Sequence, residues 1–307
     1  MAYLLVHFIG EEENGEQVYF SISKDGLHYE DLNDGKPILT LDIGEKGIRD
    51  PFILRGENGE GFYLMGTELR IANNKGWEDA QYRGSRNIVL SHSMDLIHWS
   101  KFKLVSVGLP EAGCVWAPEA IYDKENGIYM VFFSSFVKEV GEERAKHRIY
   151  TVSTKDFLTF SKAEKYMERD HDVIDMTILH YDGMYYRYFK DESTKQILGE
   201  RGRRLHGAFE RIDSTVLKEL DGVEGPTIFP IQGGQKEQDG KQWCLMVDQF
   251  AKGLGYMPMV TEQLDLGEFS ILHETEYDMG KTQKRHGSVL VIHDKEYEEL
   301  CRYYLKK

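Results

Sequence analysis

The chain has 307 residues, with 52 acidic and 38 basic side chains and a net charge of -14. This acidic balance excludes nucleic acid as a partner, because binding to phosphates needs a basic surface. The three cysteines, Cys114, Cys244 and Cys301, are odd in number and far apart, which excludes a disulfide framework and a cysteine-based metal cluster.

The N-terminal stretch predicts two antiparallel strands at residues 3–8 and 17–23, joined by a turn rich in Gly, Glu and Asn. No basic region precedes the first apolar run, and that run is only as long as a strand. We therefore expect neither a signal peptide nor a spanning helix. We also expect no membrane partner and a cytoplasmic protein, unless a signal has been removed.

Five apolar stretches with polar heads follow along the chain, at intervals of roughly 50–70 residues. Their sequences are Arg49-Asp50-Pro51-Phe52, Trp116-Ala117-Pro118-Glu119, Ile174-Asp175-Met176-Thr177, Val223-Glu224-Gly225-Pro226 and Arg285-His286-Gly287-Ser288. Each interval leaves room for about four strands, which is the period of a β-propeller blade. The many tyrosines (18), phenylalanines (15) and glycines (30) and the scarce helical periodicity favour an all-β class.

Each unit is expected to place its first strand directly after its polar head. The further strands of the first two units are predicted at residues 61–67 and 87–93 and near Trp99, then at 128–134 and 148–154 and at Phe160. The fifth unit has only its first strand, 287–292, before a short amphipathic tail. The two N-terminal strands can complete it. We predict a single domain over residues 1–307, a five-bladed β-propeller closed by the N-terminal strands joining the C-terminal blade, which removes exposed sheet edges.

A second repeated signature places an Asp two residues after a Ser or Thr. It occurs at Asp25, Asp95 and Asp156, between the expected third and fourth strands. Such a carboxylate can accept backbone N–H bonds in a tight turn, so we interpret these sites as structural corners. The basic run at residues 200–204 is interpreted as a strand edge blunted by charge.

The heads of the innermost strands would converge on one face of a propeller's central channel. These heads supply Asp50, Glu119, Asp175, Glu224 and His286. Carboxylates close together oppose ionisation and raise at least one pKa, which suits acid–base chemistry. Glycoside hydrolysis needs one carboxylic acid to protonate the leaving oxygen and one carboxylate to activate water or attack the sugar.

These heads, in this order on a five-unit repeat, resemble those of glycoside hydrolase family 43, and the likeness covers nearly the whole chain. The resemblance implies inverting hydrolysis, mainly of α-L-arabinofuranosides and β-D-xylosides. By position, Asp50 matches the general base, Asp175 the acid that tunes pKa and orients the substrate, and Glu224 the general acid. Two departures occur: Glu119 stands where Asp is usual, and Met176 where Pro or Ala is common.

Other residues around the heads are candidates for contacts with the sugar. We predict substrate-binding roles for Trp116, Glu119, Phe52 and Arg285. His286 resembles the axial histidine that lies near a calcium ion in many family members, and a neutral hydrogen-bonded histidine is the equal alternative. A calcium in the channel would be structural, and no cofactor is required for the chemistry.

The expected activity is exo-hydrolysis that releases terminal α-L-arabinofuranosyl or β-D-xylosyl residues from arabinoxylo- or xylo-oligosaccharides derived from hemicellulose. The alternatives are a non-catalytic sugar-binding propeller and a family 43 enzyme with another specificity, such as an arabinanase or galactosidase. A retaining propeller hydrolase acting on fructosides carries different heads. A protein-interaction propeller would have no need of buried acids.

Overall fold

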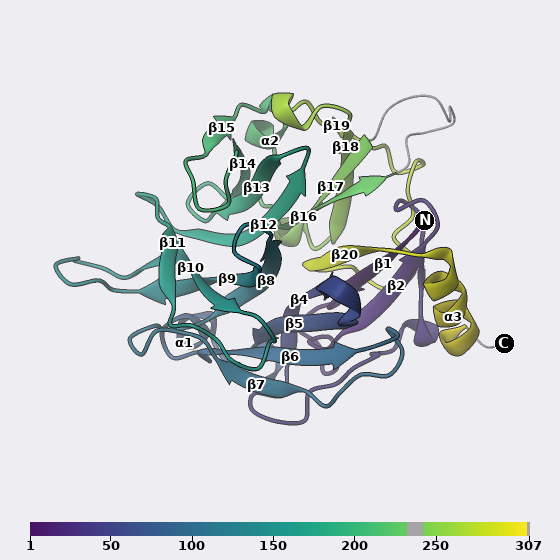
Figure 1. Cartoon of the computed structure of the whole chain (residues 1–307), viewed down its shortest axis with the longest axis horizontal. Coiled ribbons are helices and arrows are strands. Elements are labelled where there is room, and N and C mark those ends of the chain that lie inside the picture. Colours follow the sequence, from purple (N-terminus) through teal and green to yellow (C-terminus); the bar gives the residue numbers. More distant parts are fainter. Residues whose placement is uncertain (232–241, 306–307) are drawn as a thin grey trace.

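The polar-headed stretches form the innermost strands of five antiparallel sheets in a computed structural model, which describes residues 1–231 and 242–305. Each sheet has four strands, and the sheets stand around a common centre (Figure 1). The innermost strands contact one another in the order β4, β8, β12, β16 and β20, and β20 returns to β4. The molecule is therefore a five-bladed β-propeller, as predicted.

The strands of blades one and two are β4 (Ile48–Arg55), β5 (Phe62–Glu68), β6 (Asn87–Ser93), β7 (Lys103–Ser106), β8 (Trp116–Asp123), β9 (Ile128–Val137), β10 (Lys146–Thr154) and β11 (Glu164–Met167). Those of blades three and four are β12 (Val173–Tyr181), β13 (Met184–Asp191), β14 (Gln196–Gly202), β15 (Glu210–Ile212), β16 (Glu224–Ile231), β17 (Gln242–Asp248), β18 (Tyr256–Thr261) and β19 (Ser270–Ile271). Blade five contains β20 (Gly287–Ile292), β1 (Ala2–His7), β2 (Tyr19–Ser23) and β3 (Tyr29–Asp31).

Helices are short and lie between or beyond these strands. The α-helices are α1 (Trp77–Tyr82), α2 (Thr215–Glu219) and α3 (Asp294–Tyr304). The 3₁₀ turns are Asn33–Gly35, Glu57–Gly59, Ile71–Asn73, Phe250–Lys252 and Leu264–Leu266. Within residues 1–231 and 242–305, no helix is long and apolar enough to cross a membrane.

Blade five joins the two ends of the chain. Strand β1 lies between β20 and β2, so that Leu4 pairs with Leu290 on one side and with Ile22 on the other. Helix α3 follows β20 and lies beside this blade (Figure 1). The Glu296 carboxylate of α3 accepts two bonds from the Arg55 guanidinium of β4, at 2.7 and 2.8 Å. The predicted closure by the N-terminal strands is confirmed.

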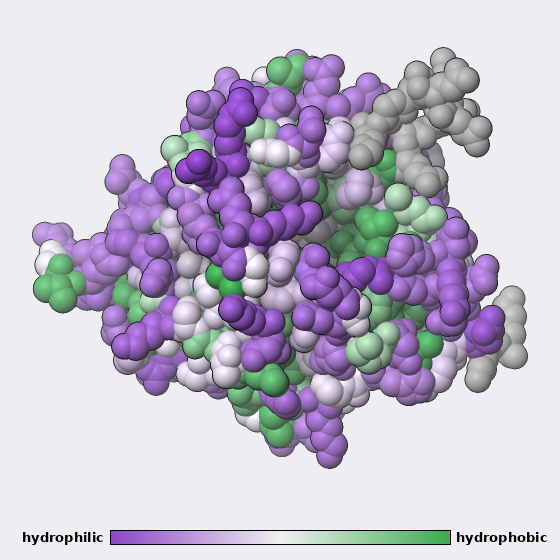
Figure 2. Space-filling view, viewed as in Figure 1, coloured by the Kyte–Doolittle hydropathy of each residue, from purple (hydrophilic) through white to green (hydrophobic). Residues whose placement is uncertain are grey.

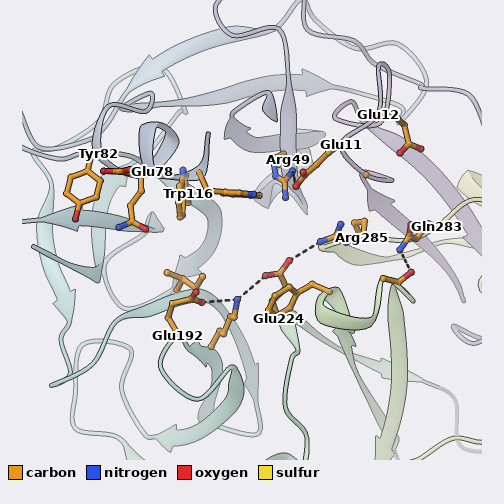
Figure 3. Close-up of a pocket in the computed structure, with 17 residues that line it drawn as sticks. Glu11, Glu12, Arg49, Glu78, Tyr82, Trp116, Glu192, Glu224, Gln283 and Arg285 are labelled. Atoms are coloured by element: carbon orange, nitrogen blue, oxygen red, sulfur yellow. Dashed lines mark hydrogen bonds and ion pairs between the residues drawn. The ribbon is translucent and has the colours of Figure 1, made fainter. Parts of the chain in front are cut away.

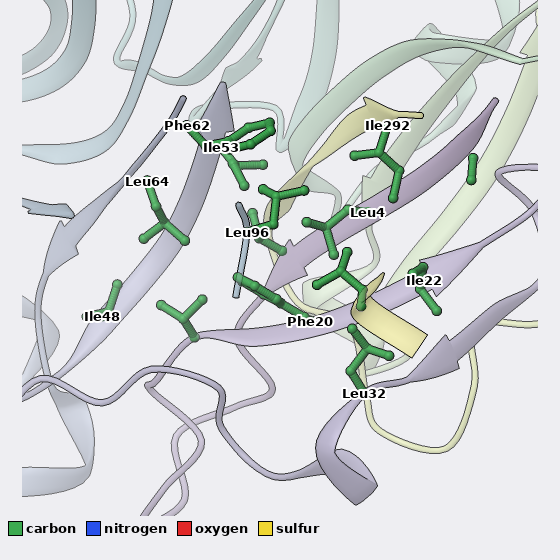
Figure 4. Packing of buried hydrophobic residues seen from close by; sticks show 14 of the residues in the cluster. Leu4, Phe20, Ile22, Leu32, Ile48, Ile53, Phe62, Leu64, Leu96 and Ile292 are labelled. Atoms are coloured by element: carbon green, nitrogen blue, oxygen red, sulfur yellow. The ribbon is translucent and has the colours of Figure 1, made fainter. Parts of the chain in front are cut away.

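Apolar side chains fill the spaces between neighbouring blades. One cluster joins blades five and one, with Leu4, Phe20 and Ile292 facing Ile53 and Leu64 (Figure 4). By contrast, hydrophilic side chains cover most of the face seen in Figure 2. Because each blade buries both of its faces against its neighbours, the innermost strands are held firmly around the centre.

The outermost strands differ from the prediction. Strand β7 begins at Lys103 rather than near Trp99, and β11 begins at Glu164 rather than at Phe160. The reason is the Ser/Thr-x-Asp corner, which takes up several residues first. Asp95, for example, accepts the N–H groups of Ile97 and His98 at 3.0 and 2.8 Å. The corners are therefore structural, as interpreted. The sequence also predicts a strand over residues 241–248 in the fourth unit, and its first residue, Lys241, lies outside the described residues.

In blades one to four the acidic heads lie inside the innermost strands, whereas Arg285 and His286 come directly before β20. Four of these strands slip in register at the head, and one residue there has a positive φ. These residues are Asp50 (φ 50), Ala117 (φ 47), Asp175 (φ 54) and Gly225 (φ 54). Such a bulge re-aims the side chains around it. It also shows that the heads are not equivalent: two acids occupy the bulge, Glu224 precedes it, and Glu119 follows it.

Candidate active site

Asp50 and Asp175 meet at the centre of the propeller, at the same ring nitrogen of His286. The His286 Nδ1 atom lies 3.2 Å from Asp50 Oδ1 and 3.8 Å from Asp175 Oδ2. The hydroxyl of Thr67 donates to Asp50 Oδ2 at 2.7 Å. The backbone N–H of Gly225 donates to Asp175 Oδ2 at 3.2 Å. Two predicted catalytic acids and the predicted axial histidine are thus in direct contact.

Charge explains how these buried groups titrate. Burial opposes the positive charge of His286, but the carboxylates of Asp175 and Asp50 outweigh it and raise the pKa of the imidazole to about 10. Burial also works to raise the pKa of Asp50, yet the imidazolium and the Thr67 bond hold it below its ordinary value. At Asp175 burial prevails and raises the pKa to about 6. The centre therefore pairs an imidazolium with an ionised Asp50.

Glycine at the fourth bulge lets this arrangement form. A Cβ atom at position 225 would lie 2.4 Å from Cγ of His286, and the φ of 54° there also favours glycine. Gly225 therefore allows β16 to approach the histidine closely. This approach brings Glu224, the preceding residue, beside Arg285, which precedes His286.

Glu224 is held between two cations on the wall of the pocket (Figure 3). Its Oε2 atom accepts a bond from Lys190 Nζ at 3.0 Å, and its Oε1 atom accepts one from Arg285 at 3.1 Å. Each cation also has a second carboxylate partner: Glu192 lies 2.8 Å from Lys190, and Asp248 lies 2.7 Å from Arg285. Lys190 and Arg285 are therefore each shared between Glu224 and a second carboxylate.

Glu119 is a different kind of acid. It lies two residues past the Ala117 bulge and is only 5% exposed. Burial raises the pKa of its carboxyl to about 8, although a bond with Thr177 works in the opposite direction. Glu119 is therefore a neutral buried carboxyl at pH 7. It is not among the described residues that line the pocket.

A pocket of about 740 Å³ opens above these groups. Of the predicted substrate-binding residues, Trp116 and Arg285 line it. Phe52 instead packs against the apolar cluster between blades one and two. The ring of His147 stacks on Trp116, with ring centroids 4.9 Å apart. Glu224 lines the pocket directly, whereas Asp50 and Asp175 lie beyond the lining residues, around His286.

Several pocket residues were not anticipated from the sequence. Lys190 is paired in register with Ile174, and Asp248 with Glu224, so both stand on second strands directly opposite a head. The sequence feature that could have pointed to Lys190 is its position as a charged residue directly after a strand rich in aromatic residues, Tyr185 to Phe189. In a regular strand the side chain of Arg49 would face away from that of its neighbour Asp50. It is held by Glu16 at 3.0 Å, and it also lines the pocket, since the bulge breaks the alternation.

The surroundings of His286 give the predicted calcium no support. Within the described part of the chain, the only three His, Cys, Asp or Glu ligand atoms that gather within 4.8 Å of one another belong to Glu139, Glu142 and Glu168, away from the centre. The His286 Nδ1 atom faces the carboxylates of Asp50 and Asp175. The calcium ion remains a prediction, and no step below depends on it.

Comparison with known proteins places this geometry in a family. The family model described as "Probable glycosyl hydrolase domain", related to family 43, matches residues 1–298. An alpha-L-arabinofuranosidase of Bifidobacterium longum is 29% identical over 208 residues, which are 62% of this chain and 19% of that protein. The chain thus spans about a fifth of the length of that relative.

Solved structures share the fold. An exo-beta-1,3-galactanase from Clostridium thermocellum superposes with a TM-score of 0.60 and 14% identity, over 87% of this chain and 58% of that one. A family 43 protein from Bacillus licheniformis gives a TM-score of 0.55 and 16% identity, over 91% and 56%. Since the family model covers almost every residue, the chain belongs to the glycosyl hydrolase domains related to glycoside hydrolase family 43.

Proposed function

We propose that this protein is an exo-acting, inverting glycoside hydrolase that releases terminal α-L-arabinofuranosyl or β-D-xylosyl residues from hemicellulose-derived oligosaccharides. The observation that supports it most is that Asp50 and Asp175 meet at His286, while Asp175 also binds the N–H of Gly225, the residue after Glu224, which lines the pocket. The arabinofuranosidase named among the relatives supports the choice of sugar.

In the proposed reaction, Glu224 gives a proton to the glycosidic oxygen as the bond from that oxygen to the anomeric carbon breaks. Asp50 takes a proton from a water molecule as the water oxygen bonds to the anomeric carbon from the opposite face. The imidazolium of His286 keeps Asp50 ionised. Asp175 is tied to the Gly225 N–H, and so it fixes the residue next to the acid.

Inverting enzymes separate their two carboxyl groups by roughly 6.5–9.5 Å, which leaves room for the attacking water. Proton NMR of the first-formed sugar tests this reaction. Nitrophenyl α-L-arabinofuranoside and β-D-xyloside are the first substrates, and a β-D-galactoside is added because one fold neighbour is a galactanase. The expected product has the anomeric configuration opposite to that of the substrate. A product that retains the configuration would overturn the roles of Asp50 and Glu224.

A further inference from the structure

Two large aromatic side chains stand half exposed at the ends of α1 and line the pocket. Trp77 is 49% exposed and Tyr82 is 53% exposed. The helix lies between β5 and β6 of blade one, so it is an addition to the four-stranded blade. Ligand pockets are lined mainly by apolar and aromatic side chains, and exposed apolar groups that gather beside a pocket mark binding surfaces.

Both rings pack against neighbouring side chains. Trp77 packs nearly perpendicular to Trp116, with centroids 6.2 Å apart, and the guanidinium of Arg49 lies 4.9 Å from its ring centre. Tyr82 packs against Phe136 with centroids 4.8 Å apart. The rings are therefore oriented before any ligand binds, which lowers the entropic cost of binding.

Polar side chains stand between these rings on the same helical face. Glu78 and Gln81 also line the pocket, whereas Ala80 is buried beneath the helix. Positions 77, 78, 81 and 82 share one face of a helix, because residues three to four apart are neighbours. Rings that take the C–H face of a sugar, beside a carboxylate and an amide that bind its hydroxyls, suit a neutral saccharide.

We propose that this face of α1 is a second sugar subsite, which binds the neutral saccharide from which the terminal sugar is released. The inference rests on the proposed function. The subsite belongs to the same cavity as Glu224, and Figure 3 shows Tyr82 and Glu78 on the far side of Trp116 from that acid. Pockets of roughly 300–1,000 Å³ hold drug-sized ligands, so 740 Å³ exceeds the need of one pentose.

The test compares two substrates that carry the same terminal sugar, a methyl glycoside and a trisaccharide. The methyl glycoside has no ring to place on α1. Trp77→Ala should lower kcat/KM for the trisaccharide relative to the methyl glycoside by about tenfold, mainly through KM. Trp77→Phe should restore most of the wild-type ratio of kcat/KM for the trisaccharide to kcat/KM for the methyl glycoside. If Trp77→Ala has the same ratio as the wild-type protein, the inference is overturned.

Tyr303→Ala is the matched control, because this aromatic residue of α3 is 48% exposed and does not line the pocket. Its ratio should equal that of the wild-type protein. If the wild-type protein hydrolyses neither substrate, the proposed function fails. The subsite is then judged by calorimetric titration of the trisaccharide: weaker binding by Trp77→Ala supports it, and equal binding or none contradicts it.

Discussion

Glu224 and Glu192 share the ammonium of Lys190, and in the proposed reaction Glu224 is the acid. Glu224→Gln should lower kcat/KM on oligosaccharides by roughly 10²–10⁴-fold, because the leaving sugar can no longer be protonated. The loss should be smaller on nitrophenyl glycosides, whose leaving group needs no proton. Glu192→Gln removes a carboxylate from the same wall and should cost far less. Equal losses in the two variants would reassign the acid.

The imidazolium of His286 predicts a pH effect. Asp50 works as a base only when ionised, and His286 helps to hold its pKa below the ordinary value. Without that cation, burial and the Asp175 charge raise the pKa of Asp50, so activity is lost at a higher pH as the solution is acidified. The acidic limb of the kcat/KM profile of His286→Asn should move up by roughly one unit or more.

Thr67→Val provides the comparison for this shift, since it leaves His286 in place and removes one hydrogen bond to Asp50, together with the bond that the Thr67 hydroxyl accepts from the Ala117 N–H. Its acidic limb should move in the same direction by a smaller amount. The unfolding temperature of each variant, measured across the same pH range, shows whether the protein is folded throughout. An acidic limb that stays in place in His286→Asn would contradict the ion pair.

At the scale of single elements, strand β1 closes the ring of blades, so a substitution in β1 tests how much this closure contributes to stability. Leu4 of β1 is fully buried between blades five and one. Leu4→Ala should lower the free energy of unfolding by about 2–5 kcal/mol, because the cavity it leaves fills only in part. Leu158→Ala, at a side chain that is 70% exposed, should change it by less than about 0.5 kcal/mol. Chemical denaturation measures both.

The sequence was sufficient to predict the innermost strands and the closure of the ring. Each innermost strand joins a polar head to an apolar run, and the single strand of the fifth unit required the N-terminal strands to complete it. The outer strands β15 and β19 have three and two residues, which is too short for any periodicity to appear. Their pairing depends on the neighbouring strand rather than on their own residues.

The sequence singles out Asp50, Asp175, Glu224, Arg285 and His286 as residues of the strand heads. The structure brings Asp50 and Asp175 to His286, and it brings Glu224 to Arg285. Lys190 and Asp248 reach the site only through the register of the second strands, which the sequence does not reveal. The bulges were missed for a related reason, since a positive φ at Asp50 or Asp175 leaves no mark on the alternation of side chains.

For the molecule as a whole, acidic side chains outnumber basic ones, and the same is true of the pocket lining. Its lining includes five glutamates, Glu11, Glu12, Glu78, Glu192 and Glu224. The lining cations Arg49, Lys190 and Arg285 are each paired with carboxylates. An anionic substituent would therefore meet repulsion, with every lining cation of the described chain already engaged.

This charge predicts selection against uronic acids. An oligosaccharide that bears a glucuronic acid should have a higher KM than the neutral oligosaccharide of the same length. Added salt should narrow the difference, because it screens exposed charges. Measuring kcat/KM for both substrates at low and high ionic strength checks this. Equal kcat/KM values for the two substrates at low salt would show that the glutamates lining the pocket do not repel the charged substrate.

The closure of blade five also bears on the order in which the chain folds. Leu4 and Leu290 pair across nearly the full length of the sequence, whereas the strands of blades one to four follow one another directly. Contacts so distant in sequence form slowly, because the entropy of closing a very long loop is lost before any contact forms. Blades one to four can therefore assemble first as an open arc. The joining of β1 to β20 would be the late step that brings His286 between Asp50 and Asp175.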